Sequence, residues 1–552
     1  MMNPVIERDL VGVLRLRKTL AMQIGSAVVL SGLVLLRWPT DARADLSGTQ
    51  AQGVFRVFGY GLGLTMLLLV PAFPATSIVR EKQSRTLGLL LNSPLSAFAI
   101  FYGKLTGVLG VAFLPLLMSI PAACACFVMG GLERQDLLLL YGVLVMLVLQ
   151  LTAIALWISS ISESADGALR TTYGVVFLLT VVTLGPYQFV HGQPWPNIVS
   201  VSLWIRSTSS LPAIMEILQH GDVGLQGLVG EKGAPLRFVT ISAAITVIFS
   251  VLTILRLNPR IFDRSRSQGV ITDDRSRGQR WLRRLIFLID PQRRSGEIGP
   301  FTNPVLIKEF RTRRFGRSHW TLRIIAVCAI VSLLLTLMSS SGSLDWGVES
   351  VGGMMVVLQV GLIVLLTPGL SAGLLSAERE SGGLALLQVT PLSPLKILTG
   401  KLLSAGLTTL TILLATLPGY VVMIYIQRTL QQQVMYVLVC LLLLAAFAVV
   451  VSALVGSWSR RTATATAASY AVVSLFCAVP MFFWLGRDAI VTGDIVASVL
   501  LISPMAAALS LMEVQGFEDY NLVPRSWSIV VAITVVLLVV LTWRTRSLLL
   551  PK

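Results

Sequence analysis

Residues 433–457 read QVMYVLVCLLLLAAFAVVVSALVGS, an apolar run of 25 residues. A helix of about twenty apolar residues is long enough to cross the hydrocarbon core of a bilayer. Similar runs recur along the whole chain of 552 residues, which is 55% hydrophobic and 13% charged, with a mean hydropathy of +0.79. Soluble proteins carry roughly a quarter charged residues. The sequence therefore predicts an all-α polytopic membrane protein.

The apolar runs predict about 12 transmembrane helices, six in each half of the chain. In the first half they lie near 20–38, 55–79, 97–128, 136–160, 168–190 and 237–258. In the second half they lie near 320–338, 351–376, 395–426, 433–457, 463–486 and 526–543.

Charge asymmetry predicts the orientation of these helices. Lys and Arg total 44 against 27 Asp and Glu, and more than half of that surplus falls in 259–319, with 15 basic and 6 acidic residues. Because cytoplasmic loops carry the excess of Lys and Arg, we expect this segment and both basic termini in the cytoplasm. An even number of spans permits that arrangement. Anionic lipid is the expected partner of the basic segment, in preference to nucleic acid.

Two features that often signal processing or cross-linking have simpler interpretations. Ala42-Arg43-Ala44 imitates a signal-peptide cleavage site, but the N-terminal pattern recurs at residue 303, where no signal peptide can lie. All five cysteines lie in apolar runs, so neither a disulfide framework nor a metal site is expected.

The chain is an internal repeat. Ten residues between Pro71 and Leu105 recur at an offset of 297, among them Glu81 as Glu378 and Lys104 as Lys401. Asn3-Pro4 recurs as Asn303-Pro304, and Arg8-Asp9 as Lys308-Glu309, at an offset of 300. Six spans per repeat give both halves the same orientation, so the repeats are parallel and related by an axis along the membrane normal. This arrangement predicts a pathway between the halves.

In each half the second span ends in an acidic segment, and a short helix follows. Leu87, Leu90 and Leu91 share one face of the first short helix, as do Leu384 and Leu387 in the second. Ser93-Pro94 and Thr390-Pro391 then match the N-cap and first-turn proline of the next span.

Glu378-Arg379-Glu380-Ser381-Gly382-Gly383-Leu384, followed by Thr390-Pro391-Leu392-Ser393 and Gly400-Lys401-Leu402-Leu403, resembles the signature of ABC-2 type permeases. These are membrane subunits of one class of ABC transporter. The first half resembles the signature less closely, because Gln83 replaces the second acid and Arg85 replaces a glycine.

The resemblance implies roles for each segment. The residues before the first span of each half would form an amphipathic elbow helix on the cytoplasmic surface, carrying Asn3, Pro4, Arg8 and Asp9, or Asn303, Pro304, Lys308 and Glu309. The loop after the second span would be a coupling helix that binds an ATP-binding subunit, through Glu81, Arg85 and Leu87, or Glu378, Arg379, Glu380 and Leu384. As an alternative, these acids only solvate a loop or pair with Arg80, Arg85 or Arg379.

The outer segment between the fifth and sixth spans would form short helices that dip into the membrane, at 210–215 and 502–507. A packed outer loop is the alternative.

Other functions are less well supported. Gly103-Lys104 and Gly400-Lys401 lack the remainder of a phosphate-binding G-x-x-x-x-G-K-[ST] loop, so these lysines are expected to snorkel to the interface. No acid lies near the middle of a span, which disfavours an intramembrane enzyme and an ion-coupled secondary transporter. A non-transporting membrane scaffold remains an alternative.

We therefore expect a first ABC-2 type permease unit at 1–258, a basic cytoplasmic linker at 259–302 and a second unit at 303–552. The expected function is an exporter subunit in the plasma (inner) membrane, with cytoplasmic termini. Two separate ATP-binding cassette subunits would supply the energy, and they would bind ATP and Mg²⁺, with no cofactor in this chain. No residue is assigned to the substrate.

Overall fold

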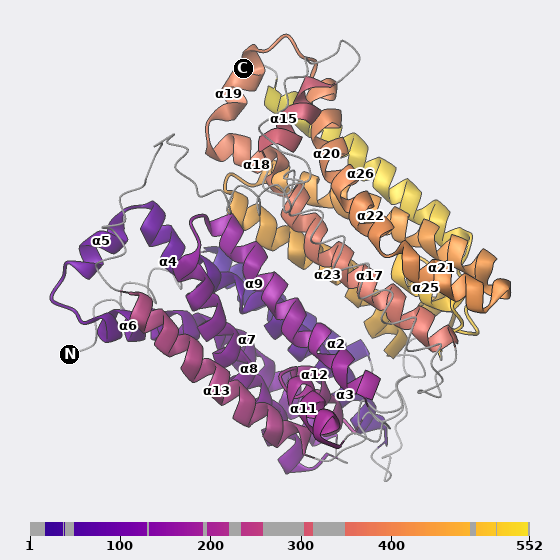
Figure 1. The fold of residues 1–552 in the computed structure, drawn as a ribbon. Helices are drawn as coiled ribbons and strands as arrows, with labels where there is room; N and C mark the ends of the chain where they lie inside the picture. The colour runs from indigo at the N-terminus through magenta and orange to yellow at the C-terminus, as the bar shows by residue number, and fades with distance from the viewer. Residues whose placement is uncertain are drawn as a thin grey trace, which may run out of the picture. The chain divides into compact units, whose positions relative to one another are not determined.

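The computed structural model describes residues 17–36, 38, 49–129, 132–190, 196–219, 233–257, 303–312, 348–485, 493–514 and 516–549. Within these ranges the secondary structure is entirely helical (Figure 1). Ten helical segments in this part are long and apolar enough to cross a membrane, or eleven if one bent pair forms a single span. The predicted all-α polytopic membrane fold is confirmed.

The helices of the first half are α2 (Arg17–Leu36), α3 (Thr49–Leu69), α4 (Ala72–Gln83), α5 (Thr86–Leu91), α6 (Ala97–Ala112), α7 (Leu114–Val128), α8 (Arg134–Ile161), α9 (Ala165–Thr180), η1 (Val182–Leu184), α10 (Gly185–Val190), α11 (Pro196–Arg206), α12 (Ser210–Ile217) and α13 (Ala234–Arg256).

Those of the second half are α15 (Pro304–Thr312), α17 (Val348–Ser371), α18 (Gly373–Glu380), α19 (Gly383–Val389), α20 (Pro394–Ala415), α21 (Leu417–Ile426), η4 (Arg428–Leu430), α22 (Gln431–Trp458), α23 (Thr462–Leu485), α24 (Gly493–Leu500), α25 (Pro504–Leu511) and α26 (Arg525–Leu549).

The observed spans follow the predicted apolar runs closely. Ten of the twelve runs correspond to candidate spans. Helix α2 covers the run at 20–38 as far as Leu36, and Gln23–Leu36 forms a shorter apolar helix. The run at 320–338 lies outside the described residues. Long runs break where proline interrupts the backbone hydrogen bonds, as between α3 and α4 at Pro71.

The chain packs into two compact units. The first contains 1–261, 470–506 and 515–522, and the second contains 262–469, 507–514 and 523–552. The C-terminal part of α23 thus belongs to the first unit, although its sequence belongs to the second repeat. These units describe packing, whereas the predicted domains 1–258, 259–302 and 303–552 describe the repeat, so that division stays a prediction.

Each unit has its own apolar core. In the first, α3 and α8 contribute side chains such as Phe58, Leu62 and Leu144, all fully buried. In the second, Leu374 of α18 packs with residues of α20, α22 and α26, including Leu398 and Leu541. Figure 1 shows the short helix α5 and helix α12 at opposite ends of the first unit, and α19 and α21 at opposite ends of the second.

The outer segments contain the short helices that the sequence predicts. Ser209 caps α12 by accepting a hydrogen bond from the backbone N–H of Leu211. Helices α24 and α25 are bent by 105° at their junction, as in a broken span or a re-entrant loop. Their insertion into the membrane stays a prediction.

Candidate coupling site

The acidic segment of the second half lies between two short helices. Helix α18 ends at Glu380, and Gly382 then adopts a φ of +76°, which reverses the chain before α19 begins. This left-handed backbone is accessible to glycine without steric strain. The turn therefore sets the angle at which α19 leaves the second span.

A buried charge network joins this segment to α15, the predicted elbow helix, and to span α20. The Lys401 ammonium lies 2.6 Å from Oε1 of Glu309 and 3.0 Å from Oε1 of Glu378. Lys308 lies 3.0 Å from the same Glu378 oxygen. Lys401 is only 1% exposed and Glu309 6%, whereas Lys308 is 50% exposed. The network contains two cations and two anions, so its formal charge is balanced.

Close backbone approach makes this network possible. A Cβ on Gly400 would lie 2.8 Å from Nδ2 of Asn303, whose amide also donates to the Lys396 carbonyl at 2.7 Å. Asn303 Oδ1 accepts from the Val305 N–H at 3.0 Å, at the start of α15. Glycine at 400 therefore lets the elbow helix pack directly on α20.

The other two charged residues of the segment serve helix ends. Arg379 donates to the Ser457 carbonyl at 2.9 Å, near the C-terminus of α22. Glu380 accepts from the N–H and the hydroxyl of Thr462, at 2.8 and 2.7 Å, at the start of α23. Both interactions place charge where helix termini favour it.

The first half repeats the acid–lysine pair, with different residues around it. Glu81 and Lys104 form an ion pair of 2.6 Å, with 13% and 4% of their side chains exposed. Lys82 reaches the Ser162 carbonyl at 3.4 Å, and Gln83 donates to the Glu163 carbonyl at 3.2 Å. Gln83 thus reaches the start of the fifth span, as Glu380 does.

The amide at 83 is compatible with this position because Ser164 caps α9 itself, accepting from the Gly167 N–H. Arg85 occupies the position of Gly382 and adopts a φ of +61°. The arginine that replaces a glycine therefore retains the glycine conformation.

The prediction that Lys104 and Lys401 snorkel to the interface is wrong. Both side chains are buried, because each has a carboxylate partner 23 residues earlier in the sequence. Glu81 and Glu378 thus pair with lysines, whereas the sequence analysis considered only Arg80, Arg85 and Arg379 as their ion-pair partners. The shared offset of Glu81 with Lys104 and of Glu378 with Lys401 was the signal that could have identified both pairs.

The predicted helix caps at Ser93 and Thr390 are also wrong. Their hydroxyls donate to the Leu90 and Leu387 carbonyls, and so close the preceding short helices. The N-caps lie three residues later, at Ser96 and Ser393, which accept from the N–H groups of Ala99 and Lys396.

The predicted short helices are present, and each has a buried and an exposed side. Leu87 is 4% exposed and packs with Phe101, and Leu384 packs against Val305 of the elbow helix. On the other side, Leu89 of α5 is 74% exposed, and on α19 Leu386 is 75% and Val389 85% exposed. The Gln388 side chain donates to the Leu548 carbonyl at 2.9 Å and so holds α19 to α26.

The two predicted elbow helices differ in what can be described. Asn303, Pro304, Lys308 and Glu309 lie on or beside α15, as predicted. Asn3, Pro4, Arg8 and Asp9 lie outside the described residues. Among the residues that are described, no three His, Cys, Asp or Glu side chains are placed to hold a metal ion.

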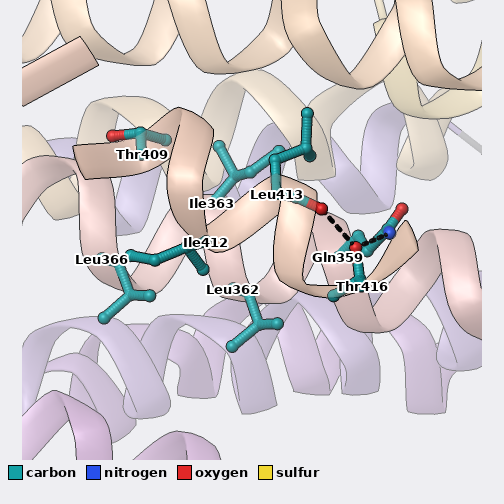
Figure 2. Close-up of a pocket in the computed structure, with 8 residues that line it drawn as sticks. All are labelled: Gln359, Leu362, Ile363, Leu366, Thr409, Ile412, Leu413 and Thr416. Carbon is teal, nitrogen blue, oxygen red and sulfur yellow. Dashed lines mark hydrogen bonds between the residues drawn. The ribbon is translucent and has the colours of Figure 1, made fainter. Parts of the chain in front are cut away.

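A small hollow lies away from the coupling segments, between α17 and α20 (Figure 2). Gln359 donates to the Thr416 hydroxyl, and Tyr420 donates to the Gln359 amide oxygen at 2.7 Å. The hollow has room for about one water molecule. Its polar residues stabilise the break between α20 and α21, and it is too small to hold an organic substrate. It is lined by Gln359, Leu362, Ile363, Leu366, Thr409, Ile412, Leu413 and Thr416.

Comparison with known proteins agrees with the paired geometry of the two halves. A family model described as ABC-2 family transporter protein matches residues 15–255 and 324–543. A search of curated proteins finds no match. The two matched regions fall on the two repeats and together cover most of the chain. The chain therefore belongs to the ABC-2 transporter family, with two permease regions in tandem.

Proposed function

We propose that this chain is the permease subunit of an ABC exporter and that separate ATP-binding subunits drive it. Its family membership supports the permease role. The observation that carries the proposal is that each repeat ends its second span in an ion-paired acidic segment, followed by a short helix with exposed apolar residues. A pair of such segments suits two ATP-binding cassette subunits, which would bind ATP and Mg²⁺.

The ion pairs give these segments a mechanical role. Glu378 connects the end of the second span to Lys401 in the third span, and Lys401 connects both to the elbow helix through Glu309. A force applied to α19 would therefore reach three elements at once. In this proposal the acids transmit motion, and the exposed apolar residues bind the partner.

The proposed location is the plasma (inner) membrane, with both termini cytoplasmic. The basic linker at 259–302 supports this orientation, since Lys and Arg accumulate on the cytoplasmic side and interact with anionic lipid. No nucleic-acid partner is proposed.

The test is affinity purification of the tagged full chain in mild detergent, followed by mass spectrometry. We expect an ATP-binding subunit to co-elute at two copies per permease, with ATPase activity that rises in the complex. Leu386→Ser with Val389→Ser should release it, whereas Leu117→Ser, at a 54% exposed site in the membrane helix α7, should not. Recovery of no ATPase in several detergents would overturn the proposal in favour of an ion-coupled carrier or a scaffold.

A further inference from the structure

Three arginines from three helical elements lie together at one end of the second compact unit. Arg379 lies in the last turn of α18, Arg460 follows α22, and Arg544 lies near the C-terminus of α26. The charges of Arg544 and Arg460 both act on the Arg379 guanidinium, so the three side chains are neighbours. All three residues belong to the second unit. In the part of the chain that the structure describes, none of them forms a salt bridge.

Helix packing explains why these arginines meet. Leu375 of α18, Leu454 of α22 and Leu541 of α26 belong to one apolar cluster. An α-helix has 3.6 residues per turn, so Arg379 lies about one turn beyond Leu375 and Arg544 about one turn beyond Leu541. The apolar contact between the three helices therefore holds the arginines next to each other.

Hydrogen bonds bring Arg379 to the segment that carries Arg460. Its Nη1 atom donates to the Ser457 carbonyl at 2.9 Å and to the Ser459 carbonyl at 3.4 Å. Arg544 is partly buried, and its Nε atom is buried without a hydrogen-bond partner in the described structure. Like charges repel, and a buried donor without a partner costs free energy. An anion bound between the guanidiniums would relieve both costs.

The acids of the coupling segment are engaged with other groups. Oε2 of Glu380 accepts hydrogen bonds from the N–H and the hydroxyl of Thr462. Glu378 pairs with Lys308 and Lys401. The arginine cluster therefore keeps an excess of positive charge, which attracts an external anion.

Two exposed tryptophans indicate the level of the membrane at which the cluster lies. Trp458 precedes Arg460 by two residues and is 58% exposed, and Trp543 precedes Arg544 and is 70% exposed. Tryptophan is enriched where the bilayer meets water, at the level of the lipid headgroups. Guanidinium groups bind phosphate oxygens through paired hydrogen bonds, and basic sites between membrane helices bind anionic headgroups. The cluster has the chemistry of a phosphate site.

The equivalent position of the first half carries the opposite charge. Lys82 corresponds to Arg379 at the repeat offset of 297, and both side chains reach the carbonyl of a serine just after the fourth span. The next residue after that serine is Glu163 in the first half and Arg460 in the second. A carboxylate repels phosphate, so the first half cannot form the same site there.

We infer that Arg379, Arg460 and Arg544 bind the headgroup phosphate of an anionic phospholipid. The bound phosphate would join the ends of the second, fourth and sixth spans of the second half. Because Gln388 of α19 donates to the Leu548 carbonyl of α26, the same lipid would also steady the short helix. The inference depends on the membrane fold and does not require the proposed ATP-binding subunits.

The test measures lipid binding to the delipidated full chain by native mass spectrometry, with dioleoylphosphatidylglycerol as the probe. Arg460→Glu introduces the acid that the first half has, and it should weaken the tightest binding by about tenfold or more. Arg544→Gln removes a charge without adding an acid and should weaken it less. Arg428→Glu makes the same charge change at an exposed arginine at the other end of α22, so it should leave this binding unchanged.

Thermal unfolding distinguishes a lipid from soluble phosphate. Phosphatidylglycerol should raise the unfolding temperature of the wild type more than that of Arg460→Glu, and sodium phosphate should act no differently from sodium chloride at equal ionic strength. Equal protection by sodium phosphate and by the lipid would overturn the assignment to a lipid headgroup. Because Arg460 is exposed, its replacement leaves the core intact. Equal lipid binding by the wild type and Arg460→Glu, or an equal loss in Arg428→Glu, would overturn the site.

Discussion

Lys401 is the residue whose environment most constrains the coupling segment. Its ammonium is almost completely buried and contacts carboxylates from two other elements. Burial removes the hydration of all three charges, so their stability depends on mutual pairing. The network therefore tolerates the loss of an exposed member better than the loss of the buried cation.

Lys401→Met should lower the free energy of unfolding by about 3–5 kcal/mol, because it leaves Glu309 and Glu378 buried without their shared cation. Lys308→Met should lower it by less than about 1 kcal/mol, since Lys308 is half exposed and its pairing is screened by solvent. Thermal unfolding of the two variants in the same detergent checks this order. Equal losses would contradict the central role of Lys401.

Arg85 illustrates backbone strain at a single position. It adopts the positive φ that Gly382 adopts in the other repeat, and a residue with a Cβ loses roughly 1–2 kcal/mol in that conformation. Arg85→Gly should therefore raise the free energy of unfolding by about 1 kcal/mol. Arg85→Ala removes the same charge but keeps the Cβ, so it should give no such gain. A gain of equal size in both variants, measured by thermal unfolding, would assign the effect to charge.

At the scale of elements, hydroxyl residues three positions apart have different roles at the start of α20. Ser393→Ala should destabilise the protein by about 1 kcal/mol, because it removes the hydrogen bond to the Lys396 N–H at the N-cap. Thr390→Ala removes only the bond to the Leu387 carbonyl, so its effect should be smaller. Chemical unfolding curves of both variants test this assignment, and the reverse order would support the cap that the sequence predicted.

Packing of the elbow helix on α20 depends on one glycine. Gly400→Ala should displace Asn303 and loosen α15, because the new Cβ would lie within 3 Å of the Asn303 side chain. Gly406→Ala on the same helix meets no atom within 4 Å, which makes it the matched control. Hydrogen exchange of residues 304–312 should speed up in the first variant only. Unchanged exchange in Gly400→Ala would show that α15 is held by other contacts.

The sequence predicted helices more reliably than caps and partners. Apolar runs of about twenty residues leave a membrane helix as the simplest structure, so the spans could be located without tertiary information. Ser93 and Ser96 both fit an N-cap, and only the backbone path distinguishes them. Whether Lys104 reaches water or a carboxylate depends on how α4 packs near α6, which no local pattern specifies.

At the scale of the whole molecule, the repeat predicted that the two halves share one architecture. The acid–lysine pairs fit that expectation, since Glu81 with Lys104 and Glu378 with Lys401 recur at one offset, but the pairs themselves were not predicted. The repeat could not predict how the halves differ. Gln83 donates to a carbonyl, whereas Glu380 caps a helix, because only the first half has a serine cap on its fifth span.

These differences predict unequal coupling by the two halves. The second short helix exposes two large apolar side chains, Leu386 and Val389, and the first exposes Leu89. Each such side chain contributes about 1–2 kcal/mol when a partner buries it. Leu386→Ser with Val389→Ser should therefore weaken binding of the ATP-binding subunit by tenfold or more, since about 1.4 kcal/mol is tenfold. Leu89→Ser should weaken it less.

Titration of the purified permease variants with the ATP-binding subunit, read out as ATPase stimulation, measures both effects. Expression and elution of each variant as a folded protein serve as the control, because all three side chains are exposed and their loss leaves the core intact. A larger effect of Leu89→Ser would assign the dominant contact to the first half, where Arg85, and not a glycine, forms the turn before the short helix. The unequal binding by the two halves would then follow from that turn. Combining Arg85→Gly with Leu89→Ser would separate the contribution of the turn angle from that of the apolar contact.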